Sequence, residues 1–188
     1  MEKRFETAMN KPILIAITGP ECTGKTTLTE QLAAHYKAAF IPEYARDYIG
    51  SLDKPYGYDD VVHVAESQLK QAINASRGSD GYVFFDTYLE ISKVWFKVVY
   101  GHYPSWIDDE IIHNKIDLYL LCDTSIPWTA DNLRENGGAM REVLYQQYRD
   151  EIVRSGCRFV EITGLGAERI ARAKAAIELF FPDIYQKI

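Results

Sequence analysis

One stretch near the N-terminus contains residues that could bind phosphate. The sequence from Ile17 to Leu32 reads ITGPECTGKTTLTEQL, and eight of its residues fit the spacing G-x-x-x-x-G-K-[ST]. The glycines of such a loop let the backbone turn tightly and approach a ligand closely. Its N–H groups, with the start of the following helix, attract anions. The pattern predicts a nucleotide-binding loop made of Gly19, Pro20, Glu21, Cys22, Thr23, Gly24, Lys25, Thr26 and Thr27.

Two side chains of this loop could take part in phosphoryl transfer. Lys25 would reach the β- and γ-phosphates of ATP, and the hydroxyl of Thr26 would bind Mg²⁺. A chance match on a turn that contains glycine is the alternative. The neighbouring residues argue against it, because ILIAI before the loop is typical of a buried strand, and Leu28 and Leu32 after it recur at helical spacing.

A carboxylate follows a second apolar run, YVFF at residues 82–85. Asp86 thus stands at the end of a predicted strand, where it could bind Mg²⁺ or accept a proton from the attacking hydroxyl group. The alternative is structural, because Asp86 could cap a helix that begins near Tyr88. Capping and catalysis could coexist at this position.

Charged residues also follow the predicted strand that ends at Ile41, within the sequence IPEYARDY. Glu43 could bind ribose hydroxyls or act as the catalytic base. Arg46 could bind a phosphate or pair with a carboxylate. The alternative is an exposed ion pair between Arg46 and Glu43 or Asp47, worth under ~1 kcal/mol.

A segment at residues 126–141 combines arginines with flanking glycine and proline residues. Such a segment is typical of a kinase lid, whose closure brings guanidinium groups to the transferred phosphoryl group and excludes water. Arg134 and Arg141 lie in it, and Arg134 is the candidate catalytic residue. The alternative is a solvated helix whose arginines have no catalytic role.

The rest of the chain alternates apolar runs with helical periodicity. Five strands are expected, at residues 13–17, up to residue 41, and at 82–85, 117–122 and 158–162. Helices are expected after the phosphate loop, around residues 61–73, and at 89–100, 141–154 and 167–181. This alternation predicts an α/β fold, a P-loop kinase-like parallel five-stranded sheet with helices on both faces and a lid segment. We expect one domain at residues 12–188 after an N-terminal extension, residues 1–11.

Composition narrows the possible partners. The 188 residues are 47% hydrophobic and 26% charged, with a formal net charge of −6, which predicts a globular domain and argues against a nucleic-acid or membrane-surface partner. A small-molecule substrate is expected instead. The three cysteines show no paired spacing, and no signal peptide or membrane-spanning stretch is recognisable, so a cytoplasmic location is expected. The oligomeric state is left open.

Several motifs in the same order resemble a known family. GPECTGKTTL, EYARDY, FFDT, DLYLLCDTSIPWTADNLR and FVEITG are similar to the ribosylnicotinamide kinase domain of NadR proteins, in the P-loop kinase class. The resemblance implies that ATP and Mg²⁺ are used to phosphorylate the 5′-hydroxyl of nicotinamide riboside, giving nicotinamide mononucleotide. By motif match, the residues implied in substrate binding are Glu43, Tyr44, Arg46, Trp128 and Asp131.

Three positions depart from that family pattern. Cys22 stands where the family has Ser, Tyr88 where it has a second Asp, and Pro42 where it has a Trp that could stack on the pyridinium ring. The kinase domain is expected to stand alone, without the other domains of NadR proteins. Asp86 is the first choice for the base and Glu43 the second. Another nucleoside or small-metabolite kinase, or an ATP-binding regulator, remains an alternative.

Overall fold

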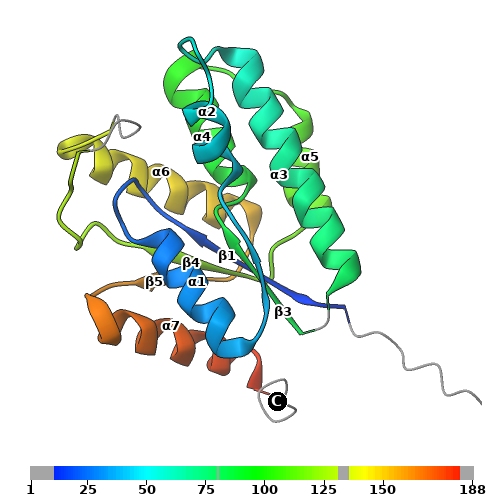
Figure 1. Ribbon diagram of the computed structural model, residues 1–188, viewed down its shortest axis with the longest axis vertical. Coiled ribbons are helices and arrows are strands. Elements are labelled where there is room, and N and C mark those ends of the chain that lie inside the picture. Colours follow the sequence, from blue (N-terminus) through cyan, green and yellow to red (C-terminus); the bar gives the residue numbers. More distant parts are fainter. Residues whose placement is uncertain (1–10, 80, 131–135, 183–188) are drawn as a thin grey trace, which may run out of the picture.

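The computed structural model describes residues 11–79, 81–130 and 136–182, and its centre is a parallel five-stranded sheet. The strands run in the order β2-β3-β1-β4-β5, as Figure 1 shows. They are β1 (Ile13–Thr18), β2 (Ala39–Ile41), β3 (Tyr82–Asp86), β4 (Leu118–Cys122) and β5 (Phe159–Ile162). The predicted α/β class and the predicted sheet are therefore confirmed.

The two faces of the sheet are both buried, which explains why its central strands read as continuous apolar runs. Side chains alternate between the faces, so that Ile15 and Ile17 of β1 belong to one core cluster and Leu14 and Ala16 to the other. Every residue of β3 and β4 is buried. The parallel pairing brings the carboxyl ends of all these strands to one edge of the sheet.

Helices cover both faces (Figure 1). One face carries α1 (Lys25–Tyr36) and α7 (Gly166–Phe180). The other carries α3 (Tyr58–Gly78), α4 (Leu89–Tyr100), α5 (Trp106–His113) and α6 (Ala139–Ser155). The short helix α2 (Tyr44–Gly50) lies against α3. The predicted helices are confirmed within a few residues, whereas α2 and α5 were not predicted.

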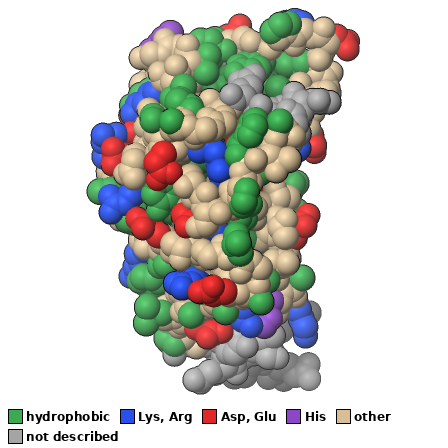
Figure 2. All heavy atoms as spheres, turned by 90° about the vertical axis from the view of Figure 1, so that its left-hand side faces the viewer, with side chains coloured by type: hydrophobic (Ala, Val, Ile, Leu, Met, Phe, Trp, Pro, Cys, Tyr) green, Lys and Arg blue, Asp and Glu red, His purple; other side chains and the backbone are tan. Residues whose placement is uncertain are grey.

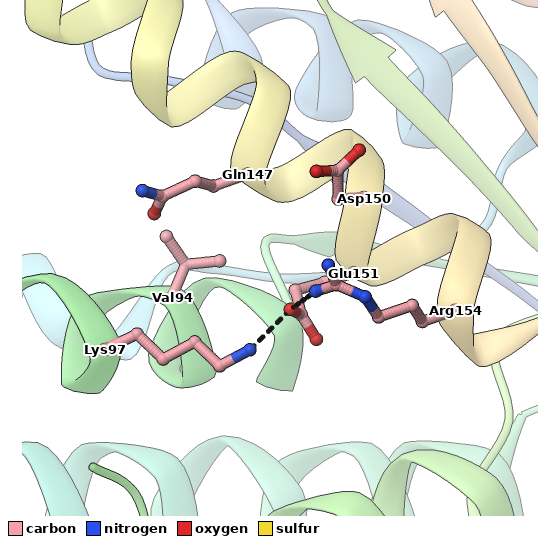
Figure 3. Close-up of a pocket in the computed structure, with 6 residues that line it drawn as sticks. All are labelled: Val94, Lys97, Gln147, Asp150, Glu151 and Arg154. Atoms are coloured by element: carbon pink, nitrogen blue, oxygen red, sulfur yellow. Dashed lines mark hydrogen bonds and ion pairs between the residues drawn. The ribbon is translucent and has the colours of Figure 1, made fainter. Parts of the chain in front are cut away.

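A network of ion pairs joins α4 to α6. A hollow of about 160 Å³ lies there, and Figure 3 shows Glu151 between Lys97 and Arg154 in its lining. The carboxylate of Glu151 is nearly inaccessible and lies 2.6 Å from the Nζ atoms of both Lys93 and Lys97. The two lysines belong to α4 and Glu151 to α6, so these ion pairs fix the two helices against each other. None of the predicted site residues lines this hollow.

Charge is mixed over the molecular face that Figure 2 presents, where acidic and basic side chains alternate without forming a basic patch. Within the part of the chain that the structure describes, no helix combines the length and the apolar character needed to cross a bilayer.

Candidate active site

The phosphate loop connects β1 to α1 at the carboxyl edge of the sheet, on the left in Figure 1. Its first glycine, Gly19, has φ of 139°, and a Cβ atom there would lie 2.5 Å from the carbonyl oxygen of Cys122. Gly24 is the N-cap of α1 with φ of 70°. These two positions need glycine because the backbone is left-handed and the first approaches a neighbouring strand too closely for a side chain.

The polar side chains of the loop meet a strand end. The hydroxyl of Thr26 donates a hydrogen bond to Oδ2 of Asp86 at 2.5 Å, and Nζ of Lys25 donates to the carbonyl of Pro20 at 3.0 Å. Asp86 is the last residue of β3 and pairs in register with Ile17. The capping alternative for Asp86 is wrong, because the N-cap of α4 is Tyr88 and no side chain caps it.

Asp86 and Thr26 fit a magnesium site. Asp86 is 2% exposed, and its Oδ1 has no hydrogen-bond partner among the described residues. Burial raises the pKa of this carboxyl, while the hydrogen bond from Thr26 and the charge of Lys25 oppose that rise. No cluster of three or more His, Cys, Asp or Glu side chains occurs in the described ranges, but Mg²⁺ in phosphate-transfer enzymes needs few protein ligands, since phosphate and water complete its shell.

A cleft of about 520 Å³ extends from the phosphate loop. At its polar end lie Glu21, Lys25, Glu43 and Arg46. Burial raises the pKa of Glu43, whereas the charge of Lys25 lowers it and that of Asp86 raises it further. Glu43 is the N-cap of α2, so the turn after β2 directs it to the loop. Glu43 and Arg46, for which the sequence suggested roles in substrate binding or catalysis, both line this cleft.

The other end of the cleft is apolar and aromatic. Trp95 and Tyr56 meet there, with ring centroids 5.1 Å apart and the indole N–H 3.4 Å from the tyrosine hydroxyl oxygen. The remaining residues at this end are aliphatic or aromatic side chains from α2, α4 and α6, namely Ile49, Ile91, Val98, Val99, Leu144 and Tyr148. A flat ring would find apolar contact here.

Two residues implied in substrate binding by the family resemblance do not line this cleft. Tyr44 lies on the surface of α2, where its hydroxyl is 2.9 Å from Nε2 of His63. Trp128 packs against Gly137, so that a Cβ atom on the glycine would lie 3.1 Å from the indole ring. The other two candidates of that segment, Asp131 and Arg134, lie outside the described residues. Of the expected lid at 126–141, the last three residues belong to α6.

Two arginines that bind the carbonyls of the phosphate loop were not predicted in this role. Arg169 of α7 donates to the carbonyl oxygen of Thr23 at 2.6 Å, and it also reaches Asp123 and Gly164. Arg141, expected on the lid, donates instead to the carbonyls of Cys22 at 3.3 Å and Ile126 at 2.9 Å. Both arginines are buried. They hold loop carbonyls on the outer side of the loop. No local pattern could have indicated their contacts with Cys22 and Thr23, which join residues 119 and 146 positions apart.

The remaining loop side chains contact the segment after β4. Glu21 accepts hydrogen bonds from the main-chain and side-chain amides of Asn136, each at 3.0 Å. Cys22 has φ of 57°, and its sulfur lies 3.3 Å from the N–H of Thr129 and 3.5 Å from the carbonyl of Pro127. The phosphate loop is thus fixed from outside by the β4–α6 connection as well as by α7.

The parallel sheet and the G-x-x-x-x-G-K-T loop between β1 and α1 are features of the P-loop fold. A family model described as AAA domain matches residues 14–169. The chain belongs to this family.

The chain also has a more specific similarity, to NadR proteins. The chain is 26% identical over 153 residues to the trifunctional NAD biosynthesis/regulator protein NadR of Salmonella typhimurium, a match that covers 79% of this chain and 37% of that protein. The chain thus spans little more than a third of that relative. The predicted similarity to NadR proteins is confirmed.

Solved structures show the same fold. A crystal structure of NadR protein in complex with NR has a TM-score of 0.76 at 21% identity, covering 90% of this chain and 51% of that one. A second NadR structure, with NAD and AMP-PNP, has a TM-score of 0.74 at 21% identity, covering 92% and 50%. Deoxyadenosine kinase from M. mycoides has a TM-score of 0.63 at 16% identity, covering 89% of this chain and all of that one.

Proposed function

We propose that this chain is an ATP-dependent kinase that phosphorylates the 5′-hydroxyl of nicotinamide riboside to nicotinamide mononucleotide. The observation that carries the proposal is the single cleft that runs from the phosphate loop, past Glu43 and Arg46, to the aromatic pair Tyr56 and Trp95. Its polar end suits phosphates and a ribose, and its apolar end suits a flat ring. The similarity to NadR proteins, one of them solved with NR, supports this acceptor.

The nucleotide would bind at the polar end. The loop N–H groups would cradle its phosphates, and Lys25 would exchange its hydrogen bond to Pro20 for one to the γ-phosphate. Thr26 and Asp86 would hold Mg²⁺, which when bound neutralises charge on the phosphates. A related NadR structure contains the ATP analogue AMP-PNP, which supports ATP as the donor.

Glu43 is the better candidate for the residue that faces the acceptor hydroxyl. It lines the cleft, whereas Asp86 is turned toward Thr26. Burial raises the pKa of both carboxyls, so the preference for Glu43 rests on its position in the cleft. This assigns Asp86 to the metal and Glu43 to the proton or the ribose, and it reverses the order of preference that the sequence suggested for the base.

Two aromatic residues, Tyr56 and Trp95, could take the place of the tryptophan that the family carries at position 42; we call them the aromatic wall. Pro42 is exposed, while Trp95 and Tyr56 lie in the cleft from other elements. Their rings could hold the pyridinium ring by stacking and by cation–π attraction. The missing second carboxylate at position 88 leaves the cleft unaffected, since Tyr88 is buried in the core and donates its hydroxyl to the carbonyl of Asn114.

The direct test is ADP release with purified protein, Mg²⁺ and ATP, in the presence of one candidate acceptor at a time. Stimulation by nicotinamide riboside alone is the expected result. Stimulation only by deoxyadenosine, thymidine or cytidine would reject the acceptor but keep the kinase. Release that no acceptor stimulates would indicate an ATP-binding regulator. Lys25→Ala serves as the low-activity control, because its rate should be at least about 100-fold below that of the wild type.

A further inference from the structure

The residue directly after Asp86 has an unusual backbone conformation. Thr87 has φ of 74°, in the left-handed region that a β-branched residue rarely occupies. It is 3% exposed, and its N–H donates to the carbonyl of Ile17 at 3.0 Å. Strain of this kind persists only where the surroundings hold it, and it is often found at functional sites.

A chain of buried hydrogen bonds holds the side chain of Thr87. The Nε2 group of Gln68, on α3, donates to the Thr87 hydroxyl at 2.9 Å, and the hydroxyl of Ser92, on α4, donates to Oε1 of Gln68 at 3.1 Å. Gln68 is 5% and Ser92 1% exposed. Two helices on one face of the sheet therefore contact the strained residue through one glutamine.

We propose that Gln68 is a positioning residue for the nucleotide site. It holds Thr87 in its left-handed conformation, and this directs the preceding Asp86 toward Thr26. The inference rests on the proposed binding of Mg²⁺-ATP by Thr26 and Asp86, but it does not depend on which acceptor is used.

The location of these residues separates positioning from direct contact. Gln68, Thr87 and Ser92 are buried and do not line the cleft. Asp86 does not line it either, but it accepts a hydrogen bond from Thr26, which does. Asp86 is fixed on one side by its register with β1 and on the other by the turn at Thr87. Burying a chain of polar groups costs more free energy than burying apolar groups. Its location next to Asp86, the proposed metal ligand, offers a functional reason for that cost.

Nucleotide affinity measured by calorimetry, with Mg²⁺ and again with EDTA, is the readout. We expect Gln68→Leu to reduce the strengthening of ATP binding by Mg²⁺ about tenfold, in the range found when a partner of a metal ligand is removed. Its ATP affinity in EDTA should change by less than about twofold, because the loop N–H groups are untouched. Gln71→Leu makes the same change one turn further along α3 and should behave as the wild type.

A double-mutant cycle tests the route through Thr87. Glycine adopts the left-handed conformation without strain, so Thr87→Gly removes the need for Gln68. In that background, Gln68→Leu should change the Mg²⁺ effect by less than about twofold, against about tenfold in the wild type. An equal loss in both backgrounds would overturn the proposal, as would a Gln68→Leu protein with a normal Mg²⁺ effect.

A second pair of variants covers the case in which Gln68→Leu does not fold. Thr87→Ser keeps the hydroxyl that Gln68 binds, and Thr87→Val keeps the shape but removes the hydroxyl. Thr87→Val should lose the Mg²⁺ effect about tenfold, and Thr87→Ser less than about threefold. Equal values for the two variants would contradict the role of this hydrogen bond. Absence of ATP binding by the wild type both with Mg²⁺ and in EDTA would instead reject the proposed nucleotide site.

Discussion

Beside the phosphate loop, three charged side chains influence one another: Lys25, Glu43 and Asp86. Burial raises the pKa of both carboxyls, and the charge of Lys25 opposes that rise. The charge of Asp86 raises the pKa of Glu43 further. Nearby carboxylates whose environments differ can divide the roles of base and metal ligand. The hydrogen bond between Thr26 and Asp86 supports our proposal that Asp86 binds the metal ion.

The first prediction at this scale concerns Lys25. Lys25→Ala should lower kcat by about 100-fold or more, because it removes a charged donor to the transferred phosphoryl group. Its Tm should stay within a few degrees of the wild type, since the lysine's hydrogen bond is to a loop carbonyl rather than to the core. Steady-state kinetics and thermal unfolding measure both. Lys70→Ala, exposed on α3, is the control, and normal kcat in Lys25→Ala would contradict the phosphate-loop assignment.

Glu43 should govern the acid side of the pH profile. A base must be ionised to act, so kcat/KM should rise with pH through the pKa of Glu43, which burial places above the usual value for a glutamate. Glu43→Gln should lower kcat and remove this limb, whereas Asp86→Asn should mainly weaken the dependence on Mg²⁺. Rates from pH 4 to pH 9 would show it. If the rise of kcat/KM with pH persists in Glu43→Gln, a group other than Glu43 causes it.

At the scale of elements, α6 and α7 hold the phosphate loop through arginines that do not line the cleft. Arg169 of α7 and Arg141 of α6 each donate to a different loop carbonyl. With the carbonyls of Thr23 and Cys22 bound on the outside, the loop keeps the conformation in which its amides can face an anion.

Removal of Arg169 should therefore weaken nucleotide binding more than a surface change on the same helix. Arg169→Met should reduce ATP affinity about tenfold and lower the stability of the free protein, since a charged hydrogen bond is worth about 1.5–3 kcal/mol. Calorimetry gives the first effect and urea unfolding the second. Arg172→Met, whose arginine pairs only with Glu168 on the surface among the described contacts, should leave ATP affinity intact. Equal losses in both variants would rule out the positioning of the loop by Arg169.

The buried Glu90 on α4 predicts a dependence of stability on pH. Burial raises the pKa of Glu90 from 4.5 to about 7. The folded state thus keeps a proton that the unfolded state loses between these values, so the contribution of this group to stability falls as pH rises and is lowest above pH 7.

Glu90→Gln removes this titration. We expect it to be more stable than the wild type at pH 8, by up to about 3 kcal/mol, with a difference that shrinks toward pH 5. Urea unfolding at pH 5, 6.5 and 8 measures it. Glu110→Gln on α5 serves as the control. A gain that is equal at all three pH values would show that Glu90 does not titrate in this range.

At the scale of the whole molecule, the sheet, the long helices and the phosphate loop could be predicted because their signals are local. Apolar runs and helical spacing decide the elements, and a fixed spacing decides the loop. The helix α2 gave no such signal, since it buries none of its residues, and α5 buries only Ile107 and Ile111.

The contacts that complete the site could not be read from the sequence. Gln68 meets Thr87 only after α3 has packed on β3, and Arg169 meets Thr23 only after α7 has packed beside the loop. The aromatic wall has the same origin, because Tyr56 and Trp95 come from separate elements. The residue types of Tyr44 and Trp128 match a family motif, but their side chains contact His63 and Gly137 and do not line the cleft.

The central claim is that the cleft transfers the γ-phosphoryl group of ATP to the 5′-hydroxyl of nicotinamide riboside. Incubation with γ-labelled ATP, Mg²⁺ and equal amounts of nicotinamide riboside and deoxyadenosine, followed by separation of the labelled products, tests it most directly. The cleft predicts labelled nicotinamide mononucleotide as the main product, in at least about tenfold excess over the deoxynucleotide. Lys25→Ala should form it at least about 100-fold more slowly. Label found only on deoxyadenosine monophosphate, or only on inorganic phosphate, would contradict it.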